Sequence, residues 1–191
     1  MQTFDEGNIR FAFPAVWSVL KYDDSLFYRG PVSRTGAGLA AVDFVVAQPG
    51  TSAALVLLEV KDFRGYATAN RSRLASGDLA TEVAKKALDT FGALHAGLRA
   101  NQREVRDLAS ALMPYAALVH VVLLLEEDEL PRVGASGHLS TANKWKRATA
   151  VKLRGEALDL LQGKLKPFRI TAALHNCADV PAGAGWLATV R

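Results

Sequence analysis

The sequence lacks most of what disulfide-rich, zinc-binding or secreted proteins need. Its 191 residues include one cysteine, Cys177, which excludes an internal disulfide scaffold and a cluster of cysteine metal ligands. Its four histidines are widely spaced, and no pair has zinc-ligand spacing. Residues 1–6 are acidic and contain no apolar run, so we expect no secretory signal. These absences predict a soluble, cytoplasmic protein in a reducing compartment.

The composition predicts one folded domain. Half of the residues are hydrophobic and 22% are charged, which is enough to bury a core and excludes disorder as the main state. Residues 108–125 carry no formal charge, but Pro114 and His120 fit a membrane span poorly. We expect no membrane segment there, and we interpret 116–125 as a strand buried on both faces. The domain is expected to have a core over about 14–126 and a basic extension over about 131–191.

Positive charge is concentrated near the C-terminus. The chain has a net charge of +4, yet residues 131–191 hold ten basic and three acidic residues. Trp145 is the aromatic residue among these lysines and arginines. Such a basic stripe can follow a phosphate backbone, and it is also typical of a solvated helix face. The sequence leaves both interpretations open.

Hydrophobic periodicity and turn residues predict a mixed α/β fold, with a central sheet flanked by helices. Asp78 is expected to cap a long amphipathic helix that begins with Leu79 and Val83. Gly163 is expected to end a later helix. The other expected elements are a strand over 9–13, a brief helix over 15–21, a hairpin of 39–48 and 53–63, a polar loop over 64–77, a helix over 102–113, a loop over 131–143, a helix over 150–162, and strands over 168–174 and 185–190.

Three charged residues lie inside the apolar strands of the hairpin. They are Asp43 in the first strand, and Glu59 and Lys61 in the second. Charges in strand interiors are costly unless they are paired or used. Alternation puts Glu59 and Lys61 on one face. A turn centred between Gly50 and Thr51 sets Asp43 opposite Leu58, on the other face, whereas a shift of one residue or a bulge brings it to Glu59.

Two carboxylates and an ammonium that converge in this way can perform phosphodiester chemistry. Hard oxygen ligands suit Mg²⁺ or Mn²⁺, which accept phosphate oxygens and lower the pKa of a bound water. Lys61 could orient or deprotonate that water, or stabilise developing negative charge. The alternative interpretation is an ordinary ion pair on an exposed sheet face.

This pattern resembles the PD-(D/E)XK phosphodiesterase superfamily, with Asp43 followed by Glu59, Val60 and Lys61 on adjacent strands and then a helix. Val42 stands where the family's name has proline. The resemblance implies a restriction-endonuclease-like core in which Asp43, Glu59 and the backbone carbonyl of Val60 hold Mg²⁺ or Mn²⁺. It also makes Lys61 the catalytic lysine. The family often adds an acid from a first helix, for which the candidates are Glu6, Asp23 and Asp24, with Asp24 as a possible metal ligand.

The same resemblance implies a nucleic-acid substrate, most simply DNA. Cations near the motif are candidates for binding substrate phosphates. They are Arg64, Arg71, Arg73, Lys85 and Lys86, and Glu82 shares their helix at a position where the family often has a polar residue. We therefore expect a metal-dependent nuclease, acting as a homodimer or as part of a larger defence or repair complex. The alternative is an inactive nuclease-like module that binds nucleic acid or a partner protein.

Overall fold

The computed structural model describes residues 1–35, 38–49, 54–112, 118–130 and 140–191. Its centre is a five-stranded sheet in the order β3-β4-β5-β6-β7. The first three strands are antiparallel, and β6 and β7 continue the sheet in parallel with β5. Their bounds are β3 (Ser18–Lys21), β4 (Phe44–Gln48), β5 (Ala54–Asp62), β6 (Leu118–Glu126) and β7 (Thr171–His175). The expected mixed α/β class is confirmed.

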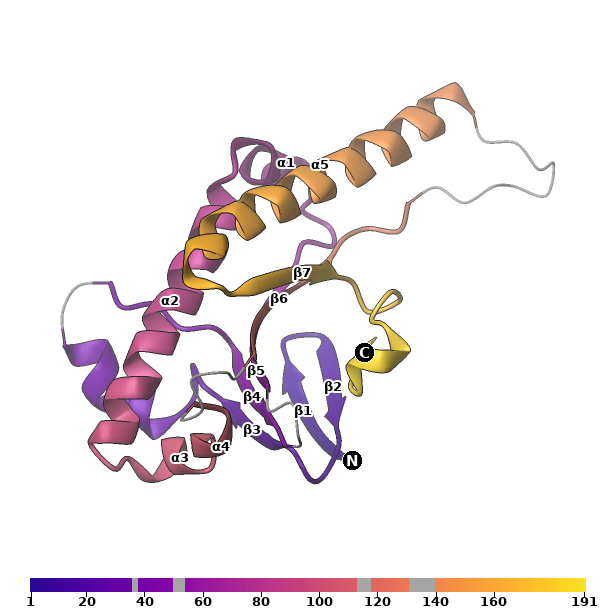
Figure 1. Ribbon diagram of the computed structural model, residues 1–191. Helices are drawn as coiled ribbons and strands as arrows, with labels where there is room; N and C mark the ends of the chain where they lie inside the picture. The colour runs from indigo at the N-terminus through magenta and orange to yellow at the C-terminus, as the bar shows by residue number, and fades with distance from the viewer. Residues whose placement is uncertain (36–37, 50–53, 113–117, 131–139) are drawn as a thin grey trace.

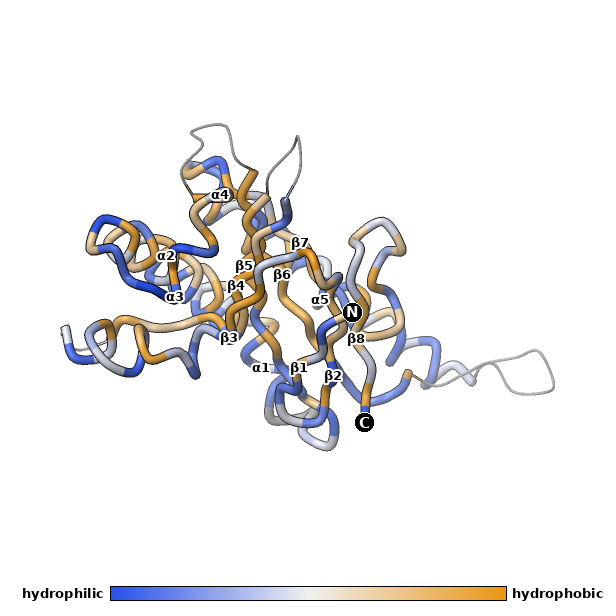
Figure 2. The backbone as a smooth tube through the Cα atoms, turned by 90° about the horizontal axis from the view of Figure 1, so that it is seen from below, coloured by the Kyte–Doolittle hydropathy of each residue, from blue (hydrophilic) through white to orange (hydrophobic). Residues whose placement is uncertain are grey.

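Both faces of the middle of the central sheet are covered, which explains why β4, β5 and β6 are mostly apolar. On β5, Leu55 and Leu57 pack into the core on the helix side, whereas Val56 and Leu58 pack into a second core. Figure 2 shows the apolar central strands with α2 and α3 on one side and a small sheet on the other. The helices are α1 (Ala67–Ser76), α2 (Asp78–Arg99), α3 (Arg103–Arg106), α4 (Ala109–Leu112) and α5 (Thr141–Leu165).

The small sheet forms the third layer and joins the two ends of the described chain. Its order is β1-β2-β8, all antiparallel, and its strands are β1 (Gln2–Glu6), β2 (Ile9–Phe13) and β8 (Leu187–Val190). Phe11, Phe13 and Trp186 pack with Phe44 of β4 in one aromatic cluster. The chain after residue 131 thus supplies β7 to the central sheet and β8 to the small one. Short helical turns cover Tyr28–Val32, Lys166–Phe168 and Ala182–Ala184.

Two expectations for the first third of the chain are wrong. The brief helix expected over 15–21 is instead a turn followed by β3, because pairing of Val19 and Leu20 with Val46 and Val45 of β4 favours an extended backbone. The strand expected over 39–48 begins only at Phe44. The local sequence after Pro14 favours a helix, but hydrogen bonding to the neighbouring strand β4 outweighs this preference.

The helices also differ from their expected bounds. The polar loop expected over 64–77 contains α1, whose one buried residue among the side chains described is Leu74, so it gave almost no periodic signal. Gly77 adopts a left-handed backbone between α1 and α2 and is the N-cap of α2, so Asp78 is the first residue of that helix and not the cap that the sequence predicted. The helix expected over 102–113 is two short helices, and Met113 lies outside the described residues. Finally, α5 begins at Thr141, after a Ser140 side chain that accepts from the Asn143 N–H, and continues through Gly163.

The strand expected over 116–125 is confirmed as β6 from Leu118 onward, whereas 116 and 117 lie outside the described residues. Most of the loop expected over 131–143 also lies outside them. Among the described residues, no helix is long and apolar enough to cross a membrane.

Gly97 marks a close contact between α2 and the segments around it. A Cβ built there would lie 2.6 Å from Phe27 Cζ and 3.1 Å from Val105 Cγ2, and both side chains belong to the core. We expect Gly97→Ala to lower the free energy of unfolding by about 1–3 kcal/mol through overpacking. Gly92→Ala is the control, because nothing lies within 4 Å of its added Cβ and alanine favours the helix. Denaturant unfolding of both variants measures the difference, and equal stabilities would contradict the close packing.

Candidate active site

The register of β4 and β5 decides whether the charged residues of the hairpin meet. Phe44 pairs with Leu58 and Val45 with Leu57. Continuing this register by one residue sets Asp43 opposite Glu59, so the register that sets Asp43 opposite Leu58 is wrong and the one shifted by one residue holds. Asp43 then lies on the same face as Glu59 and Lys61, toward the helix layer. The sequence thus identified three residues that the fold brings together.

Asp43 is a carboxylate in an environment that disfavours its charge. Only 9% of the residue is exposed, and Oδ2 accepts a hydrogen bond from the Val60 N–H at 2.6 Å. Burial, followed by the negative charge of Glu59, raises the pKa of Asp43 to about 7. The Val60 N–H and the Lys86 ammonium offset this effect only in part. A cation near Asp43 would stabilise its ionised form.

Glu59 is fully buried and only half satisfied. Its Oε1 accepts from the ammonium groups of Lys61 at 2.9 Å and Lys86 at 2.6 Å. Its Oε2 is buried and has no hydrogen-bond partner among the described residues. A buried carboxylate oxygen without a partner is costly, and such an atom calls for a ligand that the protein itself does not supply.

Lys61 lies between two carboxylates. Besides Glu59, its Nζ contacts Oε1 of Glu82 on α2 at 2.8 Å, and Arg73 on α1 holds the other oxygen of Glu82. Burial opposes the charge of Lys61, but the attractions of Glu59 and Glu82 outweigh it and raise the pKa of Lys61. The side chain is therefore an ammonium at neutral pH, held in place by a network from three elements.

The additional acid expected from a first helix comes from elsewhere. The helical turn that precedes β4, Tyr28–Val32, contains no acid, and instead β1 supplies Glu6 and the turn after β3 supplies Asp23. One carboxylate oxygen each from Glu6, Asp23 and Asp43 lie within 4.8 Å of one another. Asp24 is not part of this cluster, because it pairs with Lys21 at 2.8 Å and with Arg29.

Asp23 repeats the features of Glu59. Its Oδ1 is buried without a hydrogen-bond partner among the described residues, and burial, then the charges of Asp24 and Glu6, raise its pKa. Lys21 partly balances the group through an ion pair with Glu6 at 2.9 Å. Glu6, Asp23 and Asp43 form a cluster of hard-oxygen donors, which fits Mg²⁺ or Mn²⁺, and Glu59 lies beside Asp43 without being one of the three clustered carboxylates. The expected role of the Val60 carbonyl as a ligand stays a prediction.

The candidate phosphate-binding cations fall into two groups. Lys86 contacts Glu59, and Arg73 contacts Glu82 and stacks over the Phe63 ring with its guanidinium 5.7 Å from the ring centroid, so both belong to the site. The others are held elsewhere or face solvent: Arg64 pairs with Asp62 at 2.6 Å, Lys85 pairs with Asp89 at 2.5 Å, and Arg71 is exposed on α1.

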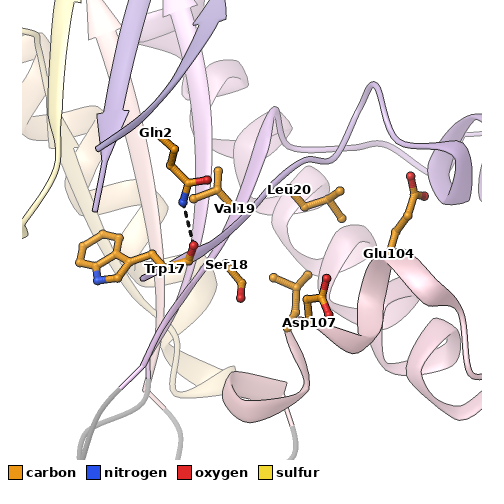
Figure 3. Close-up of a pocket in the computed structure, with 8 residues that line it drawn as sticks. Gln2, Trp17, Ser18, Val19, Leu20, Glu104 and Asp107 are labelled. Atoms are coloured by element: carbon orange, nitrogen blue, oxygen red, sulfur yellow. Dashed lines mark hydrogen bonds between the residues drawn. The ribbon is translucent and has the colours of Figure 1, made fainter. Parts of the chain in front are cut away.

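A surface pocket in the described part of the chain lies away from these carboxylates. It borders β3 near the beginning of that strand, and its lining includes Gln2, Trp17 and Asp107 (Figure 3). The Gln2 side-chain amide donates to the Trp17 carbonyl at 2.7 Å across it. Neither Asp43, Glu59 nor Lys61 lines this pocket, so the candidate site is defined by the buried charge network instead.

Comparison with known proteins adds no assignment: no family model, no curated protein and no solved structure matches this chain.

Proposed function

We propose that the protein is a metal-dependent nuclease with a restriction-endonuclease-like core, hydrolysing phosphodiester bonds of DNA. The observation that carries the proposal is the unpartnered Oε2 of the fully buried Glu59, beside Asp43 and the Lys61 ammonium. The order of elements supports it, because Asp43 directly precedes β4, Glu59 and Lys61 lie on the neighbouring β5, and helices follow β5. This is the order of residues and elements on which the resemblance rests.

Asp43, Glu59, Glu6 and Asp23 are the residues that would hold a divalent ion. A bound Mg²⁺ would supply a more acidic water and offset negative charge on the phosphate. Within the protein, the Lys61 ammonium supplies positive charge for the oxygens of the reacting phosphate. Its raised pKa favours this electrostatic role over that of a base. Glu82 and Arg73 position Lys61, and Lys86 holds Glu59 in place.

The first test measures metal binding and cleavage with the same preparation. Titration calorimetry with Mn²⁺ should show binding that Glu59→Gln removes, whereas Asp159→Asn on exposed α5 surface should leave it unchanged. Plasmid DNA, linear duplex, single-stranded DNA and RNA are then incubated with Mg²⁺ or Mn²⁺, and with a chelator as control. We expect chelator-sensitive cleavage of DNA.

Metal binding without cleavage of any substrate would contradict the nuclease proposal and favour the binding module. Absence of metal binding would contradict the assignment of the carboxylates as ligands. Dimerisation and membership in a larger complex stay predictions, and analytical ultracentrifugation with and without DNA measures the former.

A further inference from the structure

The two halves of α5 are in different environments. The second half packs into the helix-side core through Ala157, Leu161 and Leu165, and Leu160 closely approaches Gly77 between α1 and α2. In the first half, Thr141–Glu156, no residue is buried. Figure 1 shows this half extending beyond α1, away from the sheet. With a rise of about 1.5 Å per residue, the projecting half is about 24 Å long.

The projecting half is strongly basic. It carries Lys144, Lys146, Arg147, Lys152 and Arg154, against Glu156 as the one acid. Lys144 and Lys146 are exposed, and none of the ion pairs among the described residues involves either of them. Trp145 between them is 70% exposed. Because residues two apart lie about 200° apart around an α-helix, the two lysines flank the helix on nearly opposite sides, with the Trp145 ring between them.

This charge distribution does not stabilise the isolated helix. The first turn contains no acid and one lysine, Lys144, which opposes the helix dipole at a cost of about 0.3–1 kcal/mol. No side chain of this segment is fully buried, and its packing against the helix-side core comes from the partly buried Leu153 near its C-terminal end, so little packing energy offsets this cost. A polyanion along the segment would reverse the sign of the electrostatic contribution, because it neutralises the lysines and favours the positive end of the dipole.

The projecting half of α5 begins its projection from the fold close to the candidate active site. Arg154 pairs with Glu127, which directly follows β6, and with Asp179. Because β5 and β6 are parallel and Lys61 pairs with Leu125, the Lys61 end of β5 lies at this same end of the sheet. Helix α1, which carries Arg73 of the site, packs against α5. A long substrate in the site therefore has a basic helix beside it.

We propose that the projecting half of α5, Thr141–Glu156, is an arm that binds duplex DNA through its backbone phosphates. A helix about 10–12 Å wide that is exposed around most of its circumference fits the major groove, which is about 12 Å wide. The deep, narrow major groove of RNA duplexes excludes such a helix. A membrane surface would need a continuous apolar face, whereas here Lys144, Trp145, Ala148 and Lys152 share one face. This inference rests on the proposed function in one respect: that the bound duplex is also the substrate of the candidate active site.

The test compares two double variants. One removes two lysines from the projecting half of α5, and the other removes two lysines from its packed end and the turn that follows it. Fluorescence anisotropy with a labelled random-sequence duplex gives the affinity at several salt concentrations. For Lys144→Ala/Lys146→Ala we expect about tenfold weaker binding and a slope of log affinity against log salt that is shallower by about 2, since each phosphate contact contributes about 1. The control, Lys164→Ala/Lys166→Ala, removes the same charge from exposed positions near the packed end and should leave the slope unchanged.

Lys144→Arg/Lys146→Arg keeps the charge and should retain the wild-type slope, and circular dichroism checks that α5 stays helical in all variants. Equal slopes of log affinity against log salt for the two alanine variants would contradict the proposal that the arm binds duplex DNA. Binding of anionic phospholipid vesicles as tightly as the duplex would contradict it as well. Hydrolysis of bis(p-nitrophenyl) phosphate, which has no backbone for the arm to hold, should be unaffected by the α5 variants. If that ester is not hydrolysed by any variant but the slope still falls, the nuclease proposal fails and the DNA-binding arm stands.

Discussion

Lys61→Ala is expected to lower the rate of DNA cleavage by about a hundred- to thousandfold, the usual effect of removing one preorganised charge from a reacting centre. The fold should survive, because Glu59 keeps its ion pair with Lys86 and Glu82 keeps Arg73. The Lys61 side chain is only 19% exposed, so the substitution leaves a small, mostly enclosed space. It leaves no uncompensated charge, because both carboxylates keep another cation. Single-turnover cleavage under saturating metal measures the change.

Lys85→Ala is the matched control for this experiment. Lys85 is a lysine one residue from Lys86 on the same helix, but it is exposed and pairs with Asp89. Its loss should change the cleavage rate less than about threefold, since surface ion pairs contribute little. Lys61→Arg keeps a cation and should recover part of the rate if Lys61 acts through its charge. Equal rates for Lys61→Ala and wild type would end its assignment as the catalytic lysine.

Asp43→Asn is expected to abolish metal binding and cleavage while making the metal-free protein more stable at neutral and alkaline pH. The pKa of Asp43 is about 7 in the folded protein, against 3.8 for an ordinary aspartate. Between these two values the folded state holds a proton that the unfolded state has lost, so unfolding releases it and stability falls as the pH rises. The total loss is up to about 4 kcal/mol when the pH exceeds 7. Asparagine does not ionise, so the variant avoids this loss of stability, and its side-chain oxygen can still accept the hydrogen bond from the Val60 N–H.

Thermal unfolding of the metal-free protein between pH 4 and 8 measures this effect. The wild type should lose stability across the range, and Asp43→Asn should lose less. The raised pKa of Asp23 contributes a fall in the same direction, so the variant should not be entirely flat. Adding Mg²⁺ at pH 8 should stabilise the wild type and leave Asp43→Asn unchanged. A wild-type stability that rises steadily from pH 4 to pH 8 would contradict a buried, repelled carboxylate at position 43.

The part of the site that the sequence predicted is the part that local strand geometry determines. Asp43, Glu59 and Lys61 are charges within apolar strands, and alternation alone places Glu59 and Lys61 on one face. The register of Asp43 was open because one residue more or less in the turn reverses its face, and the turn signal in the sequence, Pro49 to Ser52, fits either turn length. In the folded protein, the pairing of β4 with β5 fixes the register that places Asp43 on the face of Glu59.

The part that the sequence did not predict depends on contacts between distant segments. Glu6 and Asp23 were named as alternatives for an acid on a first helix, but Glu6 lies on β1 and Asp23 in a turn, and both residues join the cluster. They meet because β1 pairs with β2 and packs its Phe4 against Phe44, next to Asp43. The role of Glu82 was equally hidden, since one acid on an amphipathic helix is typical of a solvated face. Its spacing of four residues from Lys86 was the available signal, because residues four apart share one helix face.

Pairing between β2 and β8 has a consequence for the order in which the protein matures. Ile9 pairs with Val190, so this contact closes a loop that spans nearly the whole chain. A two-stranded ribbon alone is marginally stable, and β1-β2 therefore gains its firm hold on Glu6 only after β8 has docked. During synthesis β8 is made after β1–β7, so Glu6 would be held firmly beside Asp23 and Asp43 only once β8 has docked. The metal binding that we propose would therefore arise late in folding.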